Sequence, residues 1–516
     1  MRKTNGVISR RSFVTGAGAC GALGCIDVSA AVRAISGSGR PALRVGVLSD
    51  VHVRTDGATG KKVDYSDDTT FIHALEWFRD MGVDAVVITG DITDYGKIGE
   101  MELVAEDWFR VFPGDRAPDG RKVERLFVMG NHDWDYFPSD PAGNLRRYGT
   151  KDAAEIPKHV ICGDPERIWE RIWHEPLSRV FMKNVKGYAF VGAHWMGGKG
   201  PGRYAMTKPF LETHRREIDP SKPFFYLQHP HPKDTVCPWT RFHDGGASTE
   251  ILSTFPNAVA ITGHSHYSLT DERCIWQGAF TSVNAGCLRF TEPPLDSRPP
   301  LGYENTRATY NQKKNDPGKM MPLMWADWTG RQGMLMDVYD DRIVFVRRDF
   351  LHDLSLGDDW VVPLGAGVPR PFAFAPRSAA SVAPQFPAAA KLEVRKIRAK
   401  ARGTDGRGRG AQETDAFEVT VPQANAVAKA RAFEYELSAV TVDGARTELT
   451  VLLDAGYAHS PKNRKRQVPL RCPVAFAKLP QNGKFRIEAV PVGNWGKKGR
   501  AIVSEEIIAS NGKGGA

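Results

Sequence analysis

Imidazole, carboxylate and amide side chains follow five short apolar segments of the sequence, close to the point where each segment ends. Such side chains bind divalent cations through nitrogen and oxygen atoms. One of these groups, Gly-Asn-His-Asp at 130–133, is also an ordinary exit turn from a strand when taken alone. Five groups in succession, however, indicate one shared site. The candidate residues are, in chain order, Asp50, His52, Asp91, Asp94, Asn131, His132, His229, His264 and His266.

The apolar segments that precede these residues are predicted to be β-strands. In open α/β sheets, ligands collect beyond the carboxyl ends of the strands, so the five ends are expected to meet at one place. The mixture of nitrogen and oxygen donors suits two divalent metal ions, with manganese, iron and zinc as candidates. The predicted strands are 43–48, 84–89, 125–129, 223–228 and 257–262.

The order of these motifs resembles the signature of the calcineurin-like metallophosphoesterase superfamily. The motifs are Asp-x-His at 50–52, Gly-Asp-x-x-Asp at 90–94, Gly-Asn-His-Asp at 130–133, a histidine at 229 and Gly-His-x-His at 263–266, and the resemblance spans residues 43–290. It implies one metal ion held by Asp50, His52, Asp91 and His266. It implies a second ion, bridged by Asp91 and held by Asn131, His229 and His264. It also implies that His132 is the catalytic histidine and that Asp94 orients it.

Two such ions, about 3.5–4 Å apart, can share a hydroxide and clamp the oxygens of an in-line displacement at phosphorus. His132 would stabilise the developing charge or protonate the leaving oxygen. We therefore expect a metal-dependent phosphoric ester hydrolase that acts on a phosphodiester or a phosphomonoester. The turn Asp94-Tyr95-Gly96 most resembles the cyclic nucleotide phosphodiesterase branch, which slightly favours a diester. Purple acid phosphatases resemble this site but carry a tyrosine at the position of Asp94.

Two histidines compete for one ligand position, because residues 228–232 read Gln-His-Pro-His-Pro. We favour His229, which directly follows the predicted strand. His231 is then a candidate contact to the substrate phosphate, or a loop histidine stiffened by two prolines. The long irregular stretch at 133–203 is expected to build the substrate pocket. It supplies the other candidate substrate-binding residues, Tyr136, His194 and Arg203.

The pattern of residues 41–364 predicts an α/β fold with four layers, α/β/β/α. Apolar residues at helical spacing mark 69–81 and 101–112 as crossover helices that pack on a sheet. A strand at 187–193 and a helix at 208–218 lead to His229. Strands at 279–283, 333–338 and 342–346 are expected to complete a second sheet. Two sheets face to face with helices outside are also the form of the superfamily that the motifs resemble.

A separate all-β domain is expected after a linker. Residues 365–390 are dense in Pro, Ala and Ser and lack periodicity, which predicts an extended spacer. The alternating segments that follow, with turn residues between them, are typical of a β-sandwich of the fibronectin or immunoglobulin type at 391–510. The segments are 391–399, 416–421, 431–439, 448–454, 474–477 and 483–490.

The first 40 residues resemble an export signal. Ser-Arg-Arg-Ser-Phe-Val at 9–14 is a twin-arginine pattern before a Gly- and Ala-rich run, and it predicts a periplasmic or extracellular protein. A basic amphipathic start of the first domain is the alternative. Ala-Leu-Gly-Cys at 22–25 is an imperfect lipoprotein box, which would add a lipid anchor. The seven cysteines, two of them in this signal, form no disulfide framework or zinc knuckle by their spacing.

Charge is unevenly distributed along the chain, whose formal net charge is +10. Residues 391–516 hold 23 Lys plus Arg against 13 Asp plus Glu, an excess equal to that of the whole chain. The cluster Lys462, Arg464, Lys465 and Arg466 predicts docking on an anionic cell-envelope polymer or a membrane surface, unless it is a solvated face that maintains solubility. No nucleic-acid motif accompanies the charge. A non-catalytic binding protein on the same scaffold is the alternative function, and it would be expected to have lost a metal ligand.

Overall fold

The computed structural model describes residues 39–55, 67–134, 165–196, 200–236, 243–291, 330–400, 413–424, 432–453 and 469–509 of the 516-residue chain. Three predictions lie outside these residues: the export signal up to residue 38, Tyr136 and the basic cluster at 462–466. In the part of the chain that is described, no helix combines the length and the apolar character that a membrane span requires.

The first sheet is built around three parallel strands whose ends carry predicted ligands. β1 (Leu43–Leu48), β2 (Ala85–Thr89) and β3 (Glu124–Val128) are paired in parallel, and their apolar side chains are buried on both faces, as parallel strands covered by helices require. In spatial order the sheet contains β12 (Leu354–Ser355), β11 (Arg342–Asp349), β10 (Gln332–Val338), β1 (Leu43–Leu48), β2 (Ala85–Thr89) and β3 (Glu124–Val128), with β13 (Trp360–Pro363) paired to β11.

The second sheet also has a parallel centre, formed by β5 (Tyr188–Ala193), β6 (Phe224–Leu227), β7 (Ala258–Thr262) and β9 (Thr281–Asn284). In spatial order it contains β4 (Val180–Val185), β5 (Tyr188–Ala193), β6 (Phe224–Leu227), β7 (Ala258–Thr262), β9 (Thr281–Asn284) and β8 (Ile275–Gln277). The expectation that strands 333–338 and 342–346 complete this sheet is wrong. β10 pairs antiparallel with β1, so both of these strands extend the first sheet.

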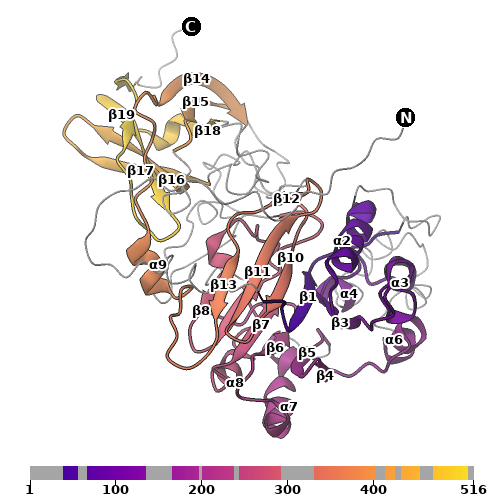
Figure 1. Cartoon of the computed structure of the whole chain (residues 1–516). Helices are drawn as coiled ribbons and strands as arrows, with labels where there is room; N and C mark the ends of the chain where they lie inside the picture. Colours follow the sequence, from indigo (N-terminus) through magenta and orange to yellow (C-terminus); the bar gives the residue numbers. More distant parts are fainter. Residues whose placement is uncertain are drawn as a thin grey trace, which may run out of the picture. The chain divides into compact units, whose positions relative to one another are not determined.

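Helices cover the outer face of each sheet, and a shared core fills the space between the sheets (Figure 1). Val45 and Phe190, from opposite sheets, belong to the inner core. Phe78 and Trp108 are buried side chains of helices that pack on the first sheet, and Leu211 is a buried side chain of a helix that packs on the second sheet. The predicted four-layer α/β fold is therefore confirmed. The covering helices are α2 (Asp67–Met81), α3 (Ile98–Val111) and α6 (Pro165–Trp173) on the first sheet, and α7 (Thr207–Thr213) and α8 (Thr249–Leu252) on the second.

Two local predictions differ from the structure. The helix expected at 208–218 ends at Thr213, and a separate 3₁₀ turn follows at Arg215–Glu217. The segment expected to be an extended spacer contains the helix α9 (Phe374–Ala380), and Arg377 of this helix donates a hydrogen bond to the carbonyl oxygen of Ile275 at 2.8 Å. The Pro- and Ala-rich composition suggested a spacer because composition alone does not indicate such side-chain contacts.

The C-terminal region forms two further β-sheets that share one core, as expected for an all-β domain. Val419 and Val474 of one sheet and Tyr435 and Leu437 of the other are buried together. The sheets comprise β14 (Glu393–Lys400), β15 (Glu413–Val421) and β18 (Leu470–Ala475), and β17 (Arg446–Leu453), β16 (Ala432–Thr441), β19 (Lys484–Gly493) and β20 (Ile502–Val503), with β21 (Ile507–Ile508) paired to β19.

Candidate metal centre

The predicted ligands follow strands that end at neighbouring positions of the two sheets. β1 and β2 are paired as far as Leu48 and Ile88, and β6 and β7 as far as Leu227 and Ile261, so the next residues leave each sheet together. Turns that are far apart in sequence consequently form one site. Its members are Asp50 and His52 after β1, Asp91 after β2, Asn131 after β3, His229 after β6, and His264 and His266 after β7.

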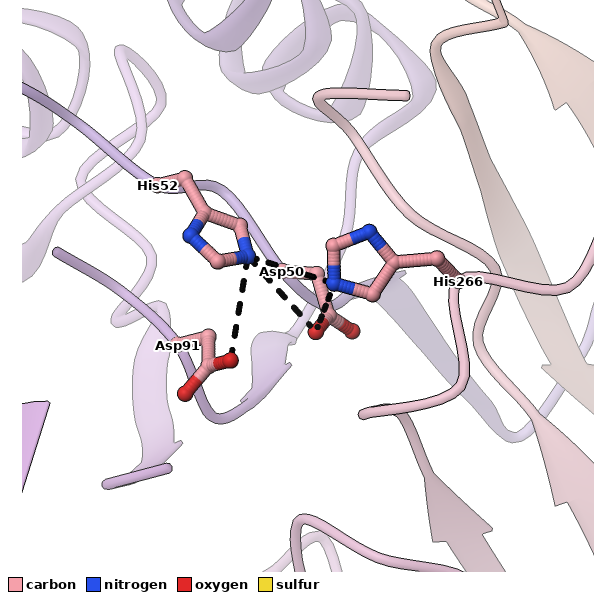
Figure 2. A group of neighbouring side chains, drawn as sticks. All are labelled: Asp50, His52, Asp91 and His266. Atoms are coloured by element: carbon pink, nitrogen blue, oxygen red, sulfur yellow. Dashed lines mark hydrogen bonds and ion pairs between the residues drawn. The ribbon is translucent and has the colours of Figure 1, made fainter. Parts of the chain in front are cut away.

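A first group of ligand atoms comes from Asp50, His52, Asp91 and His266, which offer atoms that all lie within 4.8 Å of one another. Figure 2 shows the two imidazoles and two carboxylates turned toward a common centre. Nε2 of His266 lies 3.0 Å from Oδ1 of Asp50, and Nε2 of His52 lies 3.7 Å from Oδ2 of Asp91. Both carboxylates are almost completely buried, so they require positive charge nearby.

A second group contains Asp91, His229 and His264, again within 4.8 Å, so Asp91 belongs to both groups. Nε2 of His229 lies 3.2 Å from Oδ2 of Asp91 and 3.0 Å from Oδ1 of Asn131. Nδ1 of His229 lies 2.7 Å from the carbonyl oxygen of Thr89, which can only accept a hydrogen bond. In a neutral His229, Nε2 therefore carries a lone pair that points at Oδ2 of Asp91 and Oδ1 of Asn131.

This convergence of acceptor atoms fits a pair of cations. The outward nitrogen of His52 donates to Oδ1 of Asp94 at 3.1 Å, so the Nε2 lone pair of His52 faces inward, 3.3 Å from Nε2 of His266. Oδ1 of Asp50 is buried and accepts no hydrogen bond from the described residues. Lone pairs and carboxylate oxygens that face one another in this way repel unless a positive charge lies between them. The residues present thus fit a dimetal site.

The electrostatics of the buried groups point in the same direction. Burial raises the pKa of Asp91, but the imidazoles of His229 and His132 lower it to well below its usual value. Burial lowers the pKa of His229, yet the carboxylate of Asp91 raises it to about 9. At His229 the carboxylates therefore stabilise positive charge strongly enough to overcome desolvation, whereas burial lowers the pKa of His52 to about 4 and that of His264 to well below its usual value.

The backbone of the ligand turns is strained. Five of the ligand residues adopt the left-handed conformation that favours glycine, which costs about 1–3 kcal/mol for each non-glycine residue and is concentrated at functional sites. These residues are Asp50 (φ 52°), His52 (φ 50°), Asp91 (φ 48°), His264 (φ 69°) and His266 (φ 53°). The turns aim the side chains at the site at the expense of local stability.

Glycines in two of the motifs are required by the close approach of these turns. A Cβ atom on Gly130 would lie 2.2 Å from Oδ1 of Asp91, and one on Gly263 would lie 1.7 Å from Oγ of Ser49 and 2.5 Å from Oδ2 of Asp50. Any larger residue would push a predicted metal-binding carboxylate out of position. The site therefore requires both glycines, because no larger residue fits beside the neighbouring turns.

Asp133, the last residue of the Gly-Asn-His-Asp motif, connects two ligand turns and was not among the predicted site residues. Its carboxylate accepts hydrogen bonds from the backbone N–H groups of Thr93 at 2.8 Å and Gly130 at 2.8 Å, and from Oγ1 of Thr93 at 2.6 Å. It thereby fixes the turn that carries Asp91 against the turn that carries Asn131. Its place in the motif and its acidic type were the available signals.

Asp94 has a different geometry from the one expected. Its carboxylate lies 3.1 Å from Nδ1 of His52 and 3.9 Å from Nδ1 of His132. The ring of His132 instead donates from Nδ1 to the backbone carbonyl oxygen of Asp94 at 2.8 Å. The side chain of Asp94 thus accepts a hydrogen bond from His52, a predicted metal ligand. Its main-chain carbonyl accepts one from His132, the predicted catalytic histidine.

The structure places His229, and not His231, among the ligand groups. His231 is fully buried, forms an isolated β-bridge with His243, and has its ring centroid 6.4 Å from that of His243. Burial lowers the pKa of His231 to about 3. The phosphate contact suggested for His231 stays a prediction, made for a side chain that is fully buried.

The other pocket candidates have different surroundings. His194 is buried, and its Nδ1 accepts a hydrogen bond from the backbone N–H of Met129 at 3.0 Å, so it supports the end of β3 instead of lining a pocket. The guanidinium of Arg203 lies 4.5 Å above the ring of Trp195. That ring in turn lies 5.5 Å from His264 and 5.9 Å from His229, between centroids. Arg203 is therefore one aromatic ring away from the second group, and Trp195 is a neighbour that no motif indicated.

These two groups, on the adjoining strand ends of a four-layer α/β fold, define a candidate dimetal site of a hydrolase. Residues 43–268 match the family model of the calcineurin-like phosphoesterases. This part of the chain is accordingly a calcineurin-like phosphoesterase domain, and it contains both ligand groups. The family supports a metal-dependent phosphoric ester hydrolase.

Solved structures with distant similarity were also found. A dimetal phosphatase from Danio rerio is 12% identical, with 63% of this chain and 100% of that chain covered and a TM-score of 0.34. A purple acid phosphatase from yellow lupin (Lupinus luteus) seeds is 14% identical, with 63% of this chain but only 55% of that chain covered and a TM-score of 0.38. At these values no property can be transferred between the proteins. A comparison with curated proteins found no match.

Proposed function

We propose that this protein is a dinuclear metal-dependent phosphoesterase that hydrolyses a phosphodiester or a phosphomonoester, with a diester slightly favoured. The observation that carries the proposal is the convergence of acceptor atoms from five strand ends on buried and half-buried side chains, with Asp91 shared by the two groups. A non-catalytic binding protein would not need to retain every ligand of both groups together with strained turns that aim them. The preference for a diester rests on the Asp94-Tyr95-Gly96 turn alone.

The geometry of the two groups supports the proposed ligand sets. Asp50, His52, Asp91 and His266 would hold one ion, and Asp91, Asn131, His229 and His264 would hold the other. Manganese, iron and zinc all suit such mixed nitrogen and oxygen ligands. When bound, the two ions would supply the hydroxide nucleophile and neutralise charge on the phosphate oxygens.

His132 is the group in position to move a proton. Its Nδ1 proton is committed to the carbonyl oxygen of Asp94, so Nε2 is the atom that faces the site, 3.9 Å from Oδ2 of Asp91. The side chain is 21% exposed, whereas those of Asp91 and His229 are almost fully buried, so a substrate can reach His132. A protonated Nε2 would donate to the leaving oxygen of the ester.

Substrate binding would draw on residues at the edge of the second group. Arg203 carries a permanent positive charge and is stacked on Trp195 beside His264. A guanidinium in this position suits a phosphate oxygen. In this proposal Arg203 therefore binds the ester and takes no part in bond cleavage.

The test is hydrolysis of bis(p-nitrophenyl) phosphate and of p-nitrophenyl phosphate by the protein with and without added Mn²⁺. We expect Mn²⁺-dependent turnover of at least one ester, loss of that turnover by orders of magnitude in Asp91→Ala, and retention in the control Asp80→Ala, which changes an exposed carboxylate of α2. Turnover of neither ester by protein that binds two Mn²⁺ ions would contradict the hydrolase and favour a binding protein.

A further inference from the structure

A short turn after β9, residues 286–290, makes hydrogen bonds to residues of the first ligand group and of the loop that carries it. It lies beyond the segment 43–268 that matches the family model. The backbone N–H of Leu288 donates to the carbonyl oxygen of Ser49 at 3.1 Å, and the guanidinium of Arg289 donates to the carbonyl oxygen of His52 at 2.7 Å. The turn is thus fastened to the loop that carries Asp50 and His52. Its contacts with that loop are made beside two predicted ligands.

Two side chains of this turn contact His266: the ring of Phe290, 4.4 Å away between centroids, and the thiol of Cys287. Sγ lies 3.2 Å from Nδ1 of His266, and Cys287 is fully buried. Sγ lies 3.4 Å from the carbonyl oxygen of Asp50, to which the thiol can donate its proton. Backbone N–H groups of Arg289 and Phe290 point at the sulfur, each at 3.3 Å.

These contacts define the direction of the hydrogen bond to His266. The thiol has one proton, and the carbonyl oxygen of Asp50 is an acceptor within reach of it. The sulfur then accepts from the two backbone N–H groups and from Nδ1–H of His266. With its proton on Nδ1, His266 presents the Nε2 lone pair to the first group, where Nε2 lies 3.0 Å from Oδ1 of Asp50.

We propose that Cys287 is a positioning residue that holds His266 in the tautomer required to bind the first metal ion. Each of three ligand histidines then has an outward partner of a different kind: the carboxylate of Asp94 for His52, the carbonyl oxygen of Thr89 for His229, and the thiol of Cys287 for His266. Metal-binding histidines usually donate their second N–H to such a partner, whose loss typically weakens metal binding about 10–100-fold. The inference rests on the proposed dimetal centre and is independent of which ester is hydrolysed.

The experiment measures Mn²⁺ affinity by titration of wild type, Cys287→Ala and Cys287→Ser. Ala and Ser have similar size, so the pair separates loss of the hydrogen-bond acceptor from loss of volume. We expect the dissociation constant of one ion to rise about 10–100-fold in Cys287→Ala, a smaller rise in Cys287→Ser, and little change for the other ion. Cys274→Ser is the matched control, because Cys274 is equally buried and donates to the carbonyl oxygen of Ser268.

Equal affinities of wild type and Cys287→Ala, or equal losses in the Ala and Ser variants, would overturn the proposal and leave Cys287 as a space-filling residue. Wild type that binds no Mn²⁺ would instead overturn the proposed function itself. If Cys287→Ala does not fold, the tautomer of His266 in Zn²⁺-loaded wild type decides, by ¹H–¹⁵N correlation of the imidazole. A proton on Nδ1 supports the proposal, and a proton on Nε2 contradicts it.

Discussion

The carboxylate of Asp94 lies 3.1 Å from Nδ1 of His52, whereas the backbone carbonyl oxygen of the same residue accepts from Nδ1 of His132 at 2.8 Å. One residue therefore supports two histidines through two different groups. A side-chain substitution removes the hydrogen bond to His52 and leaves the hydrogen bond to His132 in place. The two roles of Asp94 can thus be separated by mutation.

Asp94→Ala should weaken binding of the first metal ion about 10–100-fold, because His52 loses the partner of its outward nitrogen. Turnover should return when Mn²⁺ is raised, since the backbone carbonyl that holds His132 remains. Asp94→Asn keeps an oxygen acceptor and should lose less affinity. Titration of activity and of metal content with Mn²⁺ makes the comparison. Asp94→Ala with wild-type metal affinity and permanently low turnover would show that its carboxylate acts on His132 after all.

His132→Ala should give the opposite pattern. The ring of His132 is partly exposed and is not needed to complete either ligand group, so the variant should bind two ions with nearly wild-type affinity. Loss of a proton donor to the leaving oxygen should lower kcat by about 10²–10⁴-fold. The loss should shrink for an ester whose leaving group needs no protonation, such as p-nitrophenolate. A loss of bound metal equal to the loss of kcat would argue that His132 is a ligand.

Gly263→Ala should destabilise the fold and the site together. The new methyl group would lie 1.7 Å from Oγ of Ser49, and such overpacking typically costs about 1–3 kcal/mol. Urea unfolding and metal content should both report the change. Gly99→Ala is the control, because no atom lies within 4 Å of its added Cβ and because alanine favours the helix α3 by up to about 1 kcal/mol. Equal stability of the two variants would contradict the packing argument.

Glu100 should make stability fall as the pH rises toward neutrality. It is fully buried, and burial raises its pKa to about 7 from a model-peptide value of 4.5, against backbone hydrogen bonds from Tyr95 and Thr55 and the charge of Lys97. The folded chain therefore keeps a proton that the unfolded chain releases at lower pH. The stabilisation is complete below pH 4.5 and is lost as the pH rises through about 7, which amounts to about 3 kcal/mol.

Unfolding free energies of wild type and Glu100→Gln between pH 5 and 8 test this dependence. The difference between the two proteins should change with pH, with wild type losing its advantage at the higher values. Glu102→Gln, which alters a carboxylate that is 44% exposed on the same helix, is the control and should follow wild type in parallel. A parallel course for Glu100→Gln as well would contradict the protonated state.

The strand ends and the candidate ligands after them were predictable, because a short apolar run indicates a buried strand and a polar motif locates its end. Asp50, His229 and His266 could therefore be assigned before the strands were known to be neighbours. The partner of β10 was not predictable, because alternation does not indicate which of two sheets a strand extends. That β10 lies against β1 follows from a pairing between residues almost 300 positions apart, such as Leu43 with Val338.

The residues that support the ligand histidines could not be predicted from the sequence either. The direction of the Asp94 side chain depends on the left-handed turn at Asp91 and on the position of His52, neither of which is a property of a motif. Cys287 and Trp195 have no signature, since a buried cysteine and a half-buried tryptophan are ordinary residues of a packed core. His194 was expected in the pocket because it lies in the long irregular stretch at 133–203, but its Nδ1 accepts a hydrogen bond from the backbone N–H of Met129.

Anomalous diffraction from crystals grown with Mn²⁺ tests the central claim most directly. The account predicts two anomalous peaks separated by about 3.5–4 Å. One should be surrounded by Asp50, His52, Asp91 and His266, and the other by Asp91, Asn131, His229 and His264. A single peak, or peaks that do not share Asp91, would contradict the dinuclear centre on which the proposed hydrolysis depends.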